Sequence, residues 1–355
     1  MTRVAVIGAG IVGAACALAC ALRGLSVTVY ERGGLVAGTT GSGEGNILVS
    51  DKAPGPELDL ALRSNEIWRE WEPLLDRHVP GGIELERKGG LIVTRTATAI
   101  PVGIGTLVDQ TRVRELEPDI SPDITSGVFF PQDMQVQPAR AAVAMLAAAR
   151  ELGAAVRLRT PVTSLGDLDA DAIVNATGAW ASQFGVAVRV EPRRGFILVT
   201  EPLPIRIRHK VYSADYLDNV ASDDSDLQTS TVVEGTPGGP VLIGATRERV
   251  GFDATPNPQA LRRLAEGAAA LFPFLSGVRI MRYYHGFRPF APDHLPVIGP
   301  DPVTPGLWHA HGHEGAGIGL APATGDLIAA LLTGTPTTLD AAAFSPGRFT
   351  TGVPR

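Results

Sequence analysis

A glycine-rich turn near the start of the chain constrains the fold more than any other feature. The short apolar run Arg3–Ile7 is typical of a buried parallel strand, and the residues Gly-Ala-Gly-Ile-Val-Gly follow it directly. A helix rich in alanine and leucine is predicted next, over residues 14–23. Gly8 permits the tight turn, Gly10 lets a pyrophosphate approach the helix N-terminus, and Gly13 lets the helix pack close to the sheet.

An acidic residue follows the second predicted strand, Ser26–Tyr30. Glu31 comes about 20 residues after the glycines, where an acid accepts hydrogen bonds from ribose hydroxyls. A 2′-phosphate would be repelled there, which argues against NADP. Strand, glycines, helix and acid together predict a Rossmann-type dinucleotide-binding fold rather than a purely structural glycine turn. NAD and FAD both stay open on this pattern.

Two further segments of small residues suit a ligand that lies against the backbone. Residues 38–46 read Gly-Thr-Thr-Gly-Ser-Gly-Glu-Gly-Asn, which is small and polar for an ordinary connector, although a solvated loop is the alternative. The predicted buried strand Ala172–Asn175 is followed by Ala-Thr-Gly-Ala. Small residues at the carboxyl end of a strand leave room for a ligand.

The chain is long enough for two lobes. Its 355 residues can build two separate cores, and the alternation of strands and helices stops after residue 190. Residues 190–251 contain strand-like pieces separated by Pro, Gly and Asp, which predicts a mostly antiparallel sheet. The predicted fold class is therefore α/β. It combines a Rossmann-type dinucleotide-binding domain, from residues 1–50, 137–190 and 285–340, with a substrate-binding domain, from residues 51–136 and 191–284, and a tail at 341–355.

Composition excludes several function classes. The net charge is −6 with no block of like charge, so neither a nucleic-acid partner nor a polybasic membrane anchor is expected. Glycines break the apolar stretch at residues 4–22, so we expect no integral membrane segment there. Cys16 and Cys20 are one helical turn apart and are expected to be small buried side chains in a reducing, cytoplasmic compartment.

Arg288 lies in a stiff segment rich in proline and aromatic residues, between Phe287 and Pro289. A guanidinium held in such a setting is a good clamp for a carboxylate, because its fork bonds both oxygens at once. The alternative is a structural ion pair, with Asp293 as the partner. The residues alone leave both interpretations open.

A second glycine-rich turn, at residues 311–320, leads into a helix predicted over residues 321–332. Because the first helix already serves a pyrophosphate, the backbone N–H groups from Gly315 to Ile318 are available to stabilise negative charge on another group. The turn contains three potential metal ligands, His311, His313 and Glu314. Two histidines and one glutamate are too few ligands for a metal site, so no metal is expected.

These segments together resemble the D-amino acid oxidase family of FAD enzymes, which includes glycine oxidase and sarcosine oxidase. The resemblance spans essentially the whole chain. The segments that carry it are the first glycine turn with Glu31, Asn-Ala-Thr-Gly-Ala-Trp at 175–180, Gly-Phe-Arg-Pro at 286–289 and Gly-His-Glu-Gly-Ala-Gly-Ile-Gly at 312–319. Residues 43–57, 232–236 and 243–252 are most similar to the D-hydroxyproline dehydrogenase β-subunit group. Relatives of that group include opine oxidase subunits and cyanide-forming glycine dehydrogenases.

The resemblance implies the cofactor and its contacts. It implies noncovalent FAD, because the cysteine that holds the flavin in sarcosine oxidase-like members has no counterpart beyond Cys20. The loop at 38–46 would then follow the pyrophosphate and ribityl chain, and the second glycine turn would face a reduced flavin. The implied cofactor-binding residues are Gly8, Gly10, Ile11, Val12, Gly13, Glu31, Arg32, Thr39, Thr40, Ser42, Gly43, Glu44, Gly45, Val162, Ala176, Thr177, Gly178, Trp180, Gly286, Arg288, His313, Glu314, Gly315, Ala316, Gly317 and Ile318.

The resemblance also implies catalytic residues. Arg288 aligns with the family's substrate-carboxylate arginine, a tyrosine of the second domain (Tyr216, with Tyr212 as the other candidate) helps to hold the carboxylate, and His285 stands beside the arginine. The family's usual Gly-His-Gly-Gly reads Gly-His-Glu-Gly here, so Glu314 changes the local electrostatics.

The expected reaction is oxidation of a small amino or imino acid by hydride transfer from the α-carbon to flavin N5. Candidate substrates are a D-amino acid, D-proline or hydroxyproline, glycine and an N-methyl amino acid. One alternative is a dehydrogenase subunit that passes electrons to iron–sulfur or second flavoprotein subunits instead of O2, because two cysteines cannot hold a cluster alone. An NAD-dependent oxidoreductase is the other rival.

Overall fold

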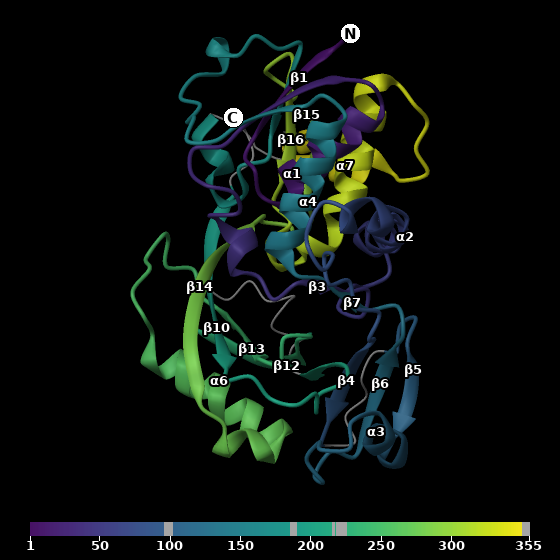
Figure 1. Cartoon of the computed structure of the whole chain (residues 1–355), viewed down its shortest axis with the longest axis vertical. Coiled ribbons are helices and arrows are strands. Elements are labelled where there is room, and N and C mark those ends of the chain that lie inside the picture. Colours follow the sequence, from purple (N-terminus) through teal and green to yellow (C-terminus); the bar gives the residue numbers. More distant parts are fainter. Residues whose placement is uncertain (96–101, 185–189, 215–216, 218–225, 350–355) are drawn as a thin grey trace.

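The computed structural model describes residues 1–95, 102–184, 190–214, 217 and 226–349. Figure 1 shows two lobes, one above the other, each built on its own sheet. The upper lobe contains both described glycine-rich turns, and the lower lobe contains a long sheet with helices on its far side.

The sheet of the first lobe has six strands in the order β15-β16-β9-β1-β2-β8. All neighbouring pairs are parallel except β15–β16, which confirms the Rossmann-type expectation. The strands come from three separate stretches of the chain: β1 (Arg3–Ile7), β2 (Ser26–Tyr30), β8 (Ala155–Arg157), β9 (Ala172–Asn175), β15 (Val297–Pro300) and β16 (Leu307–His311). The domain boundaries proposed from the sequence stay a prediction.

Three helices of this lobe pack closely through small residues: α1 (Ile11–Leu22), α4 (Pro138–Glu151) and α7 (Gly317–Thr333). A Cβ on Gly325 of α7 would lie 2.5 Å from the carbonyl oxygen of Ala15 in α1, so only glycine allows this approach. Helix α2 (Pro56–Asp76) covers α7, and the indole of its Trp68 donates a hydrogen bond to the carbonyl oxygen of Gly319. Cys16 and Cys20 are free and buried in α1, as expected.

Helix α7 is also the described helix that is long and apolar enough to cross a membrane, when counted from Glu314 to Thr333. However, 67% of its most apolar window is buried inside the fold, against α1 and α2. This burial is typical of a core helix.

The second lobe holds an eight-stranded sheet in the order β14-β10-β13-β12-β11-β4-β6-β5. Every neighbouring pair is antiparallel except β11–β4, so the expected mostly antiparallel sheet is confirmed. Its strands are β4 (Gly90–Thr94), β5 (Thr106–Asp109), β6 (Ser126–Phe130), β10 (Glu191–Thr200), β11 (Lys210–Ser213), β12 (Gln228–Gly235), β13 (Val241–Arg247) and β14 (Ile280–Phe290).

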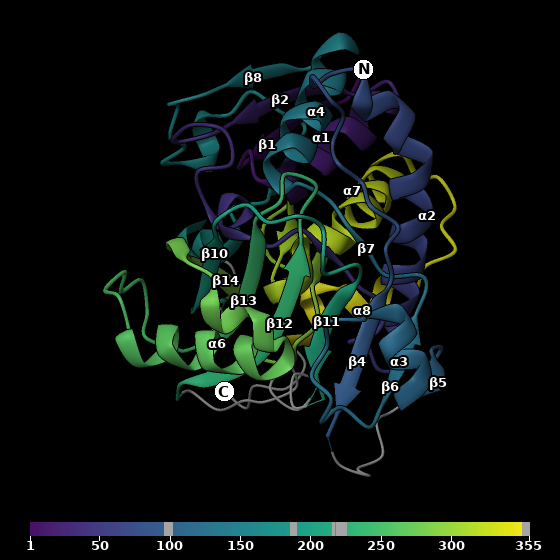
Figure 2. The ribbon, with the colours of Figure 1, turned by 60° about the horizontal axis from the view of Figure 1, so that its bottom comes forward.

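One face of this sheet packs on α6 (Pro258–Leu271) and α3 (Gln110–Leu116), as Figure 2 shows for α6. The other face is turned to the first lobe. There the two-stranded ribbon of β3 (Asn46–Ile47) and β7 (Met134–Gln135) contacts it through the hydrogen bonds of Asn46 and Gln135. The candidate site lies between the lobes, above this inner face.

Several elements differ from the sequence expectation; helix α1, for example, begins at Ile11 instead of residue 14. Two further differences bear on the site. Strand β14 was not predicted, because its prolines, aromatics and charges hide the alternation of a strand. The side chains of β14 nevertheless alternate, since Arg288 and His285 point to opposite faces. Helix α7 begins at Gly317 instead of residue 321, so glycines of the turn are helical in spite of their low helix propensity, and the Gly319 carbonyl also accepts hydrogen bonds from Ser64 and Trp68.

Candidate active site

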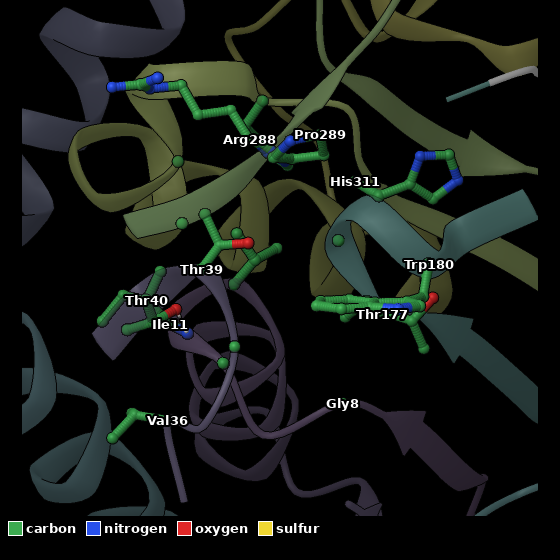
Figure 3. A pocket seen from close by; sticks show the side chains of 18 of the residues that line it. Gly8, Ile11, Val36, Thr39, Thr40, Thr177, Trp180, Arg288, Pro289 and His311 are labelled. Atoms are coloured by element: carbon green, nitrogen blue, oxygen red, sulfur yellow. Dashed lines mark hydrogen bonds between the residues drawn. The ribbon is translucent and has the colours of Figure 1, made fainter. Parts of the chain in front are cut away.

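A single cavity of about 460 Å³ connects both glycine-rich turns to the second sheet. In Figure 3, Arg288 and Pro289 of β14 lie on one side of it, Thr177 and Trp180 on another, and Gly8, Ile11 and Thr40 below. The lining therefore comes from segments that are far apart in the sequence.

The first glycine turn has the backbone geometry that the sequence predicts. Gly8 has a φ of 107°, and a Cβ there would lie 2.6 Å from the carbonyl oxygen of Ala176, so this position requires glycine. A Cβ on Gly13 would lie 2.0 Å from the carbonyl oxygen of Gly8, which shows how closely α1 approaches the turn. Ile11 N–H donates to Thr40 Oγ1 at 3.0 Å, which ties the second small-residue segment to the start of α1.

Glu31 closes this end of the cavity. Its carboxylate accepts hydrogen bonds from the N–H groups of Ala9, at 2.9 Å, and Gly33, at 2.8 Å. Carboxylate oxygens have further lone pairs, so Glu31 can still accept hydrogen bonds from sugar hydroxyls. Beside it the Arg32 guanidinium lies 4.2 Å from the ring centre of Trp180, which stacks on Phe252. These flat groups suit a planar ring system.

The N-terminus of α7 lines the same cavity through Gly315, Gly317 and Ile318. His313 precedes this helix, and its Nε2 forms a hydrogen bond with Thr324 Oγ1 at 2.9 Å. The imidazole is neutral because burial lowers its pKa to about 3. Two helix N-termini therefore face one cavity, each with backbone N–H groups and partial positive charge.

Glu314 is held by ionic contacts at the start of this turn. Its carboxylate contacts the guanidinium of Arg193 and lies 3.2 Å from Nδ1 of His294. Burial alone would raise the pKa of Glu314, but the hydrogen bond from His294 and the charges of Arg193 and Arg247 lower it to about 2. The negative charge is thus matched by surrounding cations.

Arg288 reaches the cavity from the inner face of the second sheet. Its Nη1 donates to the carbonyl oxygen of Thr246 at 2.8 Å and lies 2.1 Å from where a Cβ of Gly195 would be. The glycine makes room for the guanidinium, and the carbonyl sets its orientation. Asp293, the alternative partner considered from the sequence, instead binds Arg348 at 2.6 Å.

Nearly all of the predicted cofactor residues line the cavity. Exceptions among the described residues are Gly13, Gly45 and Ala316, which lie close behind the lining. The catalytic candidates lie in different places. Arg288 lines the cavity, whereas His285 packs on the opposite face of β14 against Phe196 and Phe287. Tyr216 lies outside the described residues. Tyr212 is buried, and its hydroxyl contacts Ser50.

Several polar residues of the lining were not expected from the sequence, among them Asn46, Arg247 and His311. Asn46 ends the loop at 38–46, and Arg247 ends β13 in a segment that supported the family resemblance. His311 is the inner member of a buried chain in which Asp301 binds His309 and His309 binds His311, at 2.8 and 3.0 Å. Only the fold brings these residues together.

The residues present fit a dinucleotide cofactor. Glycine keeps the turn at Gly8 open, and His311 Nδ1 is a buried atom without a hydrogen-bond partner in the described part of the chain. His311 lines the cavity, so a bound ligand can supply that partner. Within the described ranges no group of three or more His, Cys, Asp or Glu side chains could hold a metal ion.

Comparison with known proteins decides which dinucleotide is involved. Residues 3–331 match the DAO family model, described as FAD dependent oxidoreductase. The chain belongs to this family. FAD is therefore its cofactor, and the DAO-family members it resembles are oxidoreductases that act on C–N bonds.

Three relatives of this FAD-dependent oxidoreductase illustrate the range of its family. It is 29% identical to the bifunctional protein ThiO/ThiG of Nostoc sp. over 94% of this chain, but spans 53% of that protein. It is 30% identical to the hydrogen cyanide synthase subunit HcnC of Pseudomonas protegens, over 87% of this chain and 79% of the relative. The glycine oxidase structure of Geobacillus kaustophilus superimposes with a TM-score of 0.85 at 25% identity, over 98% of this chain and 99% of that one.

Proposed function

We propose that this FAD enzyme oxidises a small amino or imino acid at the carbon next to nitrogen. The observation that carries the proposal is that the Arg288 guanidinium lines the same cavity as the two helix N-termini. A carboxylate held by Arg288 would lie in the cavity that receives the cofactor. FAD supplies the two-electron acceptor for the hydrogen that leaves the α-carbon as hydride.

The protein groups of the cavity have distinct tasks in this proposal. Arg288 binds the substrate carboxylate, and the Thr246 carbonyl and the gap at Gly195 keep its fork in one orientation. The backbone N–H groups at the start of α7 stabilise negative charge that develops at their side of the cavity. Ile197 and Ala245 supply apolar walls that limit water near the reacting carbon.

The proposal leaves open which molecule accepts the electrons from the reduced flavin, and the HcnC relatives provide a second candidate. HcnC of Pseudomonas aeruginosa, 31% identical over 83% of this chain, is named as a subunit of hydrogen cyanide synthase. A dehydrogenase that passes electrons to a partner subunit is therefore the second candidate. Stopped-flow mixing of the reduced enzyme with O2 separates the two, because an oxidase reoxidises within its turnover time and a dehydrogenase does so far more slowly.

The proposal is tested by anaerobic mixing of the holoenzyme with D-amino acids, cyclic imino acids, glycine and sarcosine, monitored by flavin absorbance. At least one of them should bleach the flavin. Replacement of Arg288 by Ala should then lower kcat/KM on the order of 100-fold or more, because a charge-assisted pair is lost. Arg282→Ala is the matched control, since Arg282 lies on the exposed part of the same strand. No bleaching by any of these compounds, or unchanged kcat/KM in Arg288→Ala, would remove the assignment.

A further inference from the structure

Glu44 is a buried carboxylate with unused hydrogen-bonding capacity in the cavity. Its residue is 7% exposed and lines the cavity. Oε2 accepts a hydrogen bond from Asn46 Nδ2 at 3.1 Å, whereas Oε1 is buried without a hydrogen-bond partner among the described residues. Leaving a buried carboxylate oxygen unpaired is costly, so such an atom points to a ligand.

The carboxylate of Glu44 is turned toward the second sheet. A Cβ on Gly244 of β13 would lie 1.9 Å from Glu44 Oε1, so glycine makes room for the carboxylate at the sheet surface. Tyr284 of β14 is close enough to be affected: burial first, and then the negative charges of Glu44 and Glu234, raise the pKa of its hydroxyl. Glu44 was expected among the cofactor contacts, but its carboxylate lies at the inner face of the eight-stranded sheet.

A second buried carboxylate lies near Glu44. Glu234 is fully buried nearby, and it binds Lys210 at 2.5 Å and Gln135 at 2.7 Å. Lys210 also donates a hydrogen bond to Asn46, the residue that binds Glu44. Lys210 thus pairs directly with Glu234 and reaches Glu44 only through Asn46. A cation at the free oxygen of Glu44 would pair with its buried charge.

Arg288 and Glu44 are placed to bind opposite ends of one small molecule. Both groups meet the inner face of the second sheet at a glycine. Arg288 Nη1 lies 2.1 Å from where a Cβ of Gly195 would be, and Glu44 Oε1 lies 1.9 Å from where a Cβ of Gly244 would be.

An α-amino or imino acid carries a carboxylate and a basic nitrogen on the same carbon. Arg288 and Glu44 line one cavity and carry the opposite charges, so such a molecule is complementary to the pair.

We propose that Glu44 binds the positively charged nitrogen of the substrate while Arg288 binds its carboxylate. Glu44 Oε1 then takes one proton from this nitrogen before hydride leaves the α-carbon, so that the nitrogen lone pair can form the C=N bond. This inference rests on the proposed function and narrows it. The site selects zwitterionic amino and imino acids over 2-hydroxy and 2-alkoxy acids of the same shape, because an oxygen in place of the nitrogen carries no charge for Glu44. The selectivity comes from Glu44 Oε1. An ether oxygen would face it with a lone pair, and a hydroxyl group would give it a hydrogen bond without a positive charge.

The test uses substrates and their oxygen analogues with the FAD-loaded full chain. D-proline is paired with tetrahydrofuran-2-carboxylate, sarcosine with methoxyacetate, and glycine with glycolate. Apparent dissociation constants for the amines come from the concentration dependence of anaerobic flavin reduction. Those for the analogues come from their competition in the same assay. In the wild-type enzyme, the best amine should bind at least about tenfold more tightly than its oxygen analogue.

Glu44→Gln keeps the shape of the side chain and removes its charge. This variant should bind the amine at least about tenfold more weakly, while the analogue binds as before or more tightly. Glu117→Gln is the control: Glu117 is a fully buried carboxylate that pairs with His209, and it does not line the cavity. It should leave both constants unchanged.

Several outcomes would overturn the inference. A wild-type enzyme that binds amine and analogue equally well excludes it without any variant. Equal weakening of both ligands in Glu44→Gln, or of neither, also excludes it. Failure of every amine to reduce the wild-type flavin refutes the proposed function itself, whereas normal reduction with unchanged selectivity in Glu44→Gln refutes only the role of Glu44.

Discussion

Glu314 shows how one residue can depart from a family pattern without disturbing the site. The resemblance described from the sequence implies a glycine at this position of the turn, and here a carboxylate lies next to the cavity. Arg193 and the more distant Arg247 surround that carboxylate with positive charge, and His294 forms a hydrogen bond with it, so its charge is compensated within the protein. We expect Glu314 to stabilise the fold instead of binding substrate.

This role predicts a pH-dependent stability. The pKa of Glu314 is about 2 in the folded protein and near the ordinary 4.5 when unfolded, so its contribution is fully present above pH 4.5 and is lost as the pH falls toward 2. Glu314→Gln should lower the free energy of unfolding at pH 7 by up to ~3 kcal/mol, with a smaller effect near pH 3. Denaturant unfolding of both proteins at pH 7, 5 and 3 measures the difference. An effect that does not shrink with falling pH would contradict the assignment.

At the scale of elements, the approach of α1 to β1 depends on glycines. Gly8 needs its positive φ, and Gly13 leaves no room for a side chain between the helix and the turn. Glycine has the same role in the second sheet, where Gly195 and Gly244 make room for the charged ends of Arg288 and Glu44. In both lobes glycine allows a ligand-binding group to come close to the backbone.

Gly13→Ala should therefore displace the start of α1. The added methyl group would meet a backbone carbonyl at 2.0 Å, which cannot move like a flexible side chain. We expect a loss of ~1–3 kcal/mol in the free energy of unfolding and at least tenfold weaker FAD binding. Gly34→Ala is the matched control, because a Cβ there meets nothing within 4 Å. Equal FAD affinity in the two variants, measured by titration of the apoprotein, would argue against the close approach.

At the scale of the whole molecule, we propose that the cofactor occupies the cavity between the two lobes without a covalent bond. Both cysteines are fully buried in α1, and the described lining of the cavity contains no cysteine. FAD would be held by helix N-termini, glycine turns and the flat groups around Trp180. Its binding free energy then adds to the stability of both lobes together.

Acid precipitation of the purified holoenzyme should release all of its FAD into the supernatant. The reason is that unfolding destroys every contact that holds a noncovalent cofactor. Flavin absorbance of the supernatant and of the washed pellet measures the two fractions. A yellow pellet would show a covalent link and would overturn the prediction.

The glycine turn, Glu31 and the Rossmann-type start could be predicted from sequence, because a tight turn, a helix N-terminus and a strand are set by residues that are neighbours in the chain. The same holds for the start of the late glycine turn, although its helix begins at Gly317 instead of residue 321. The neighbours of Arg288 in the sequence make it a candidate for binding a carboxylate, but they leave a substrate carboxylate and Asp293 as alternative partners. In the structure Asp293 binds Arg348.

Tertiary structure alone decided the rest. Which face of β14 carries Arg288 and which carries His285 depends on the register with β10, and register is a contact between segments about 90 residues apart. The meeting of Glu44 with Gly244, and the cavity between the lobes, depend on the packing of whole elements. Local propensity determines turns and helices, whereas a site assembled across two sheets exists only once long-range contacts have formed.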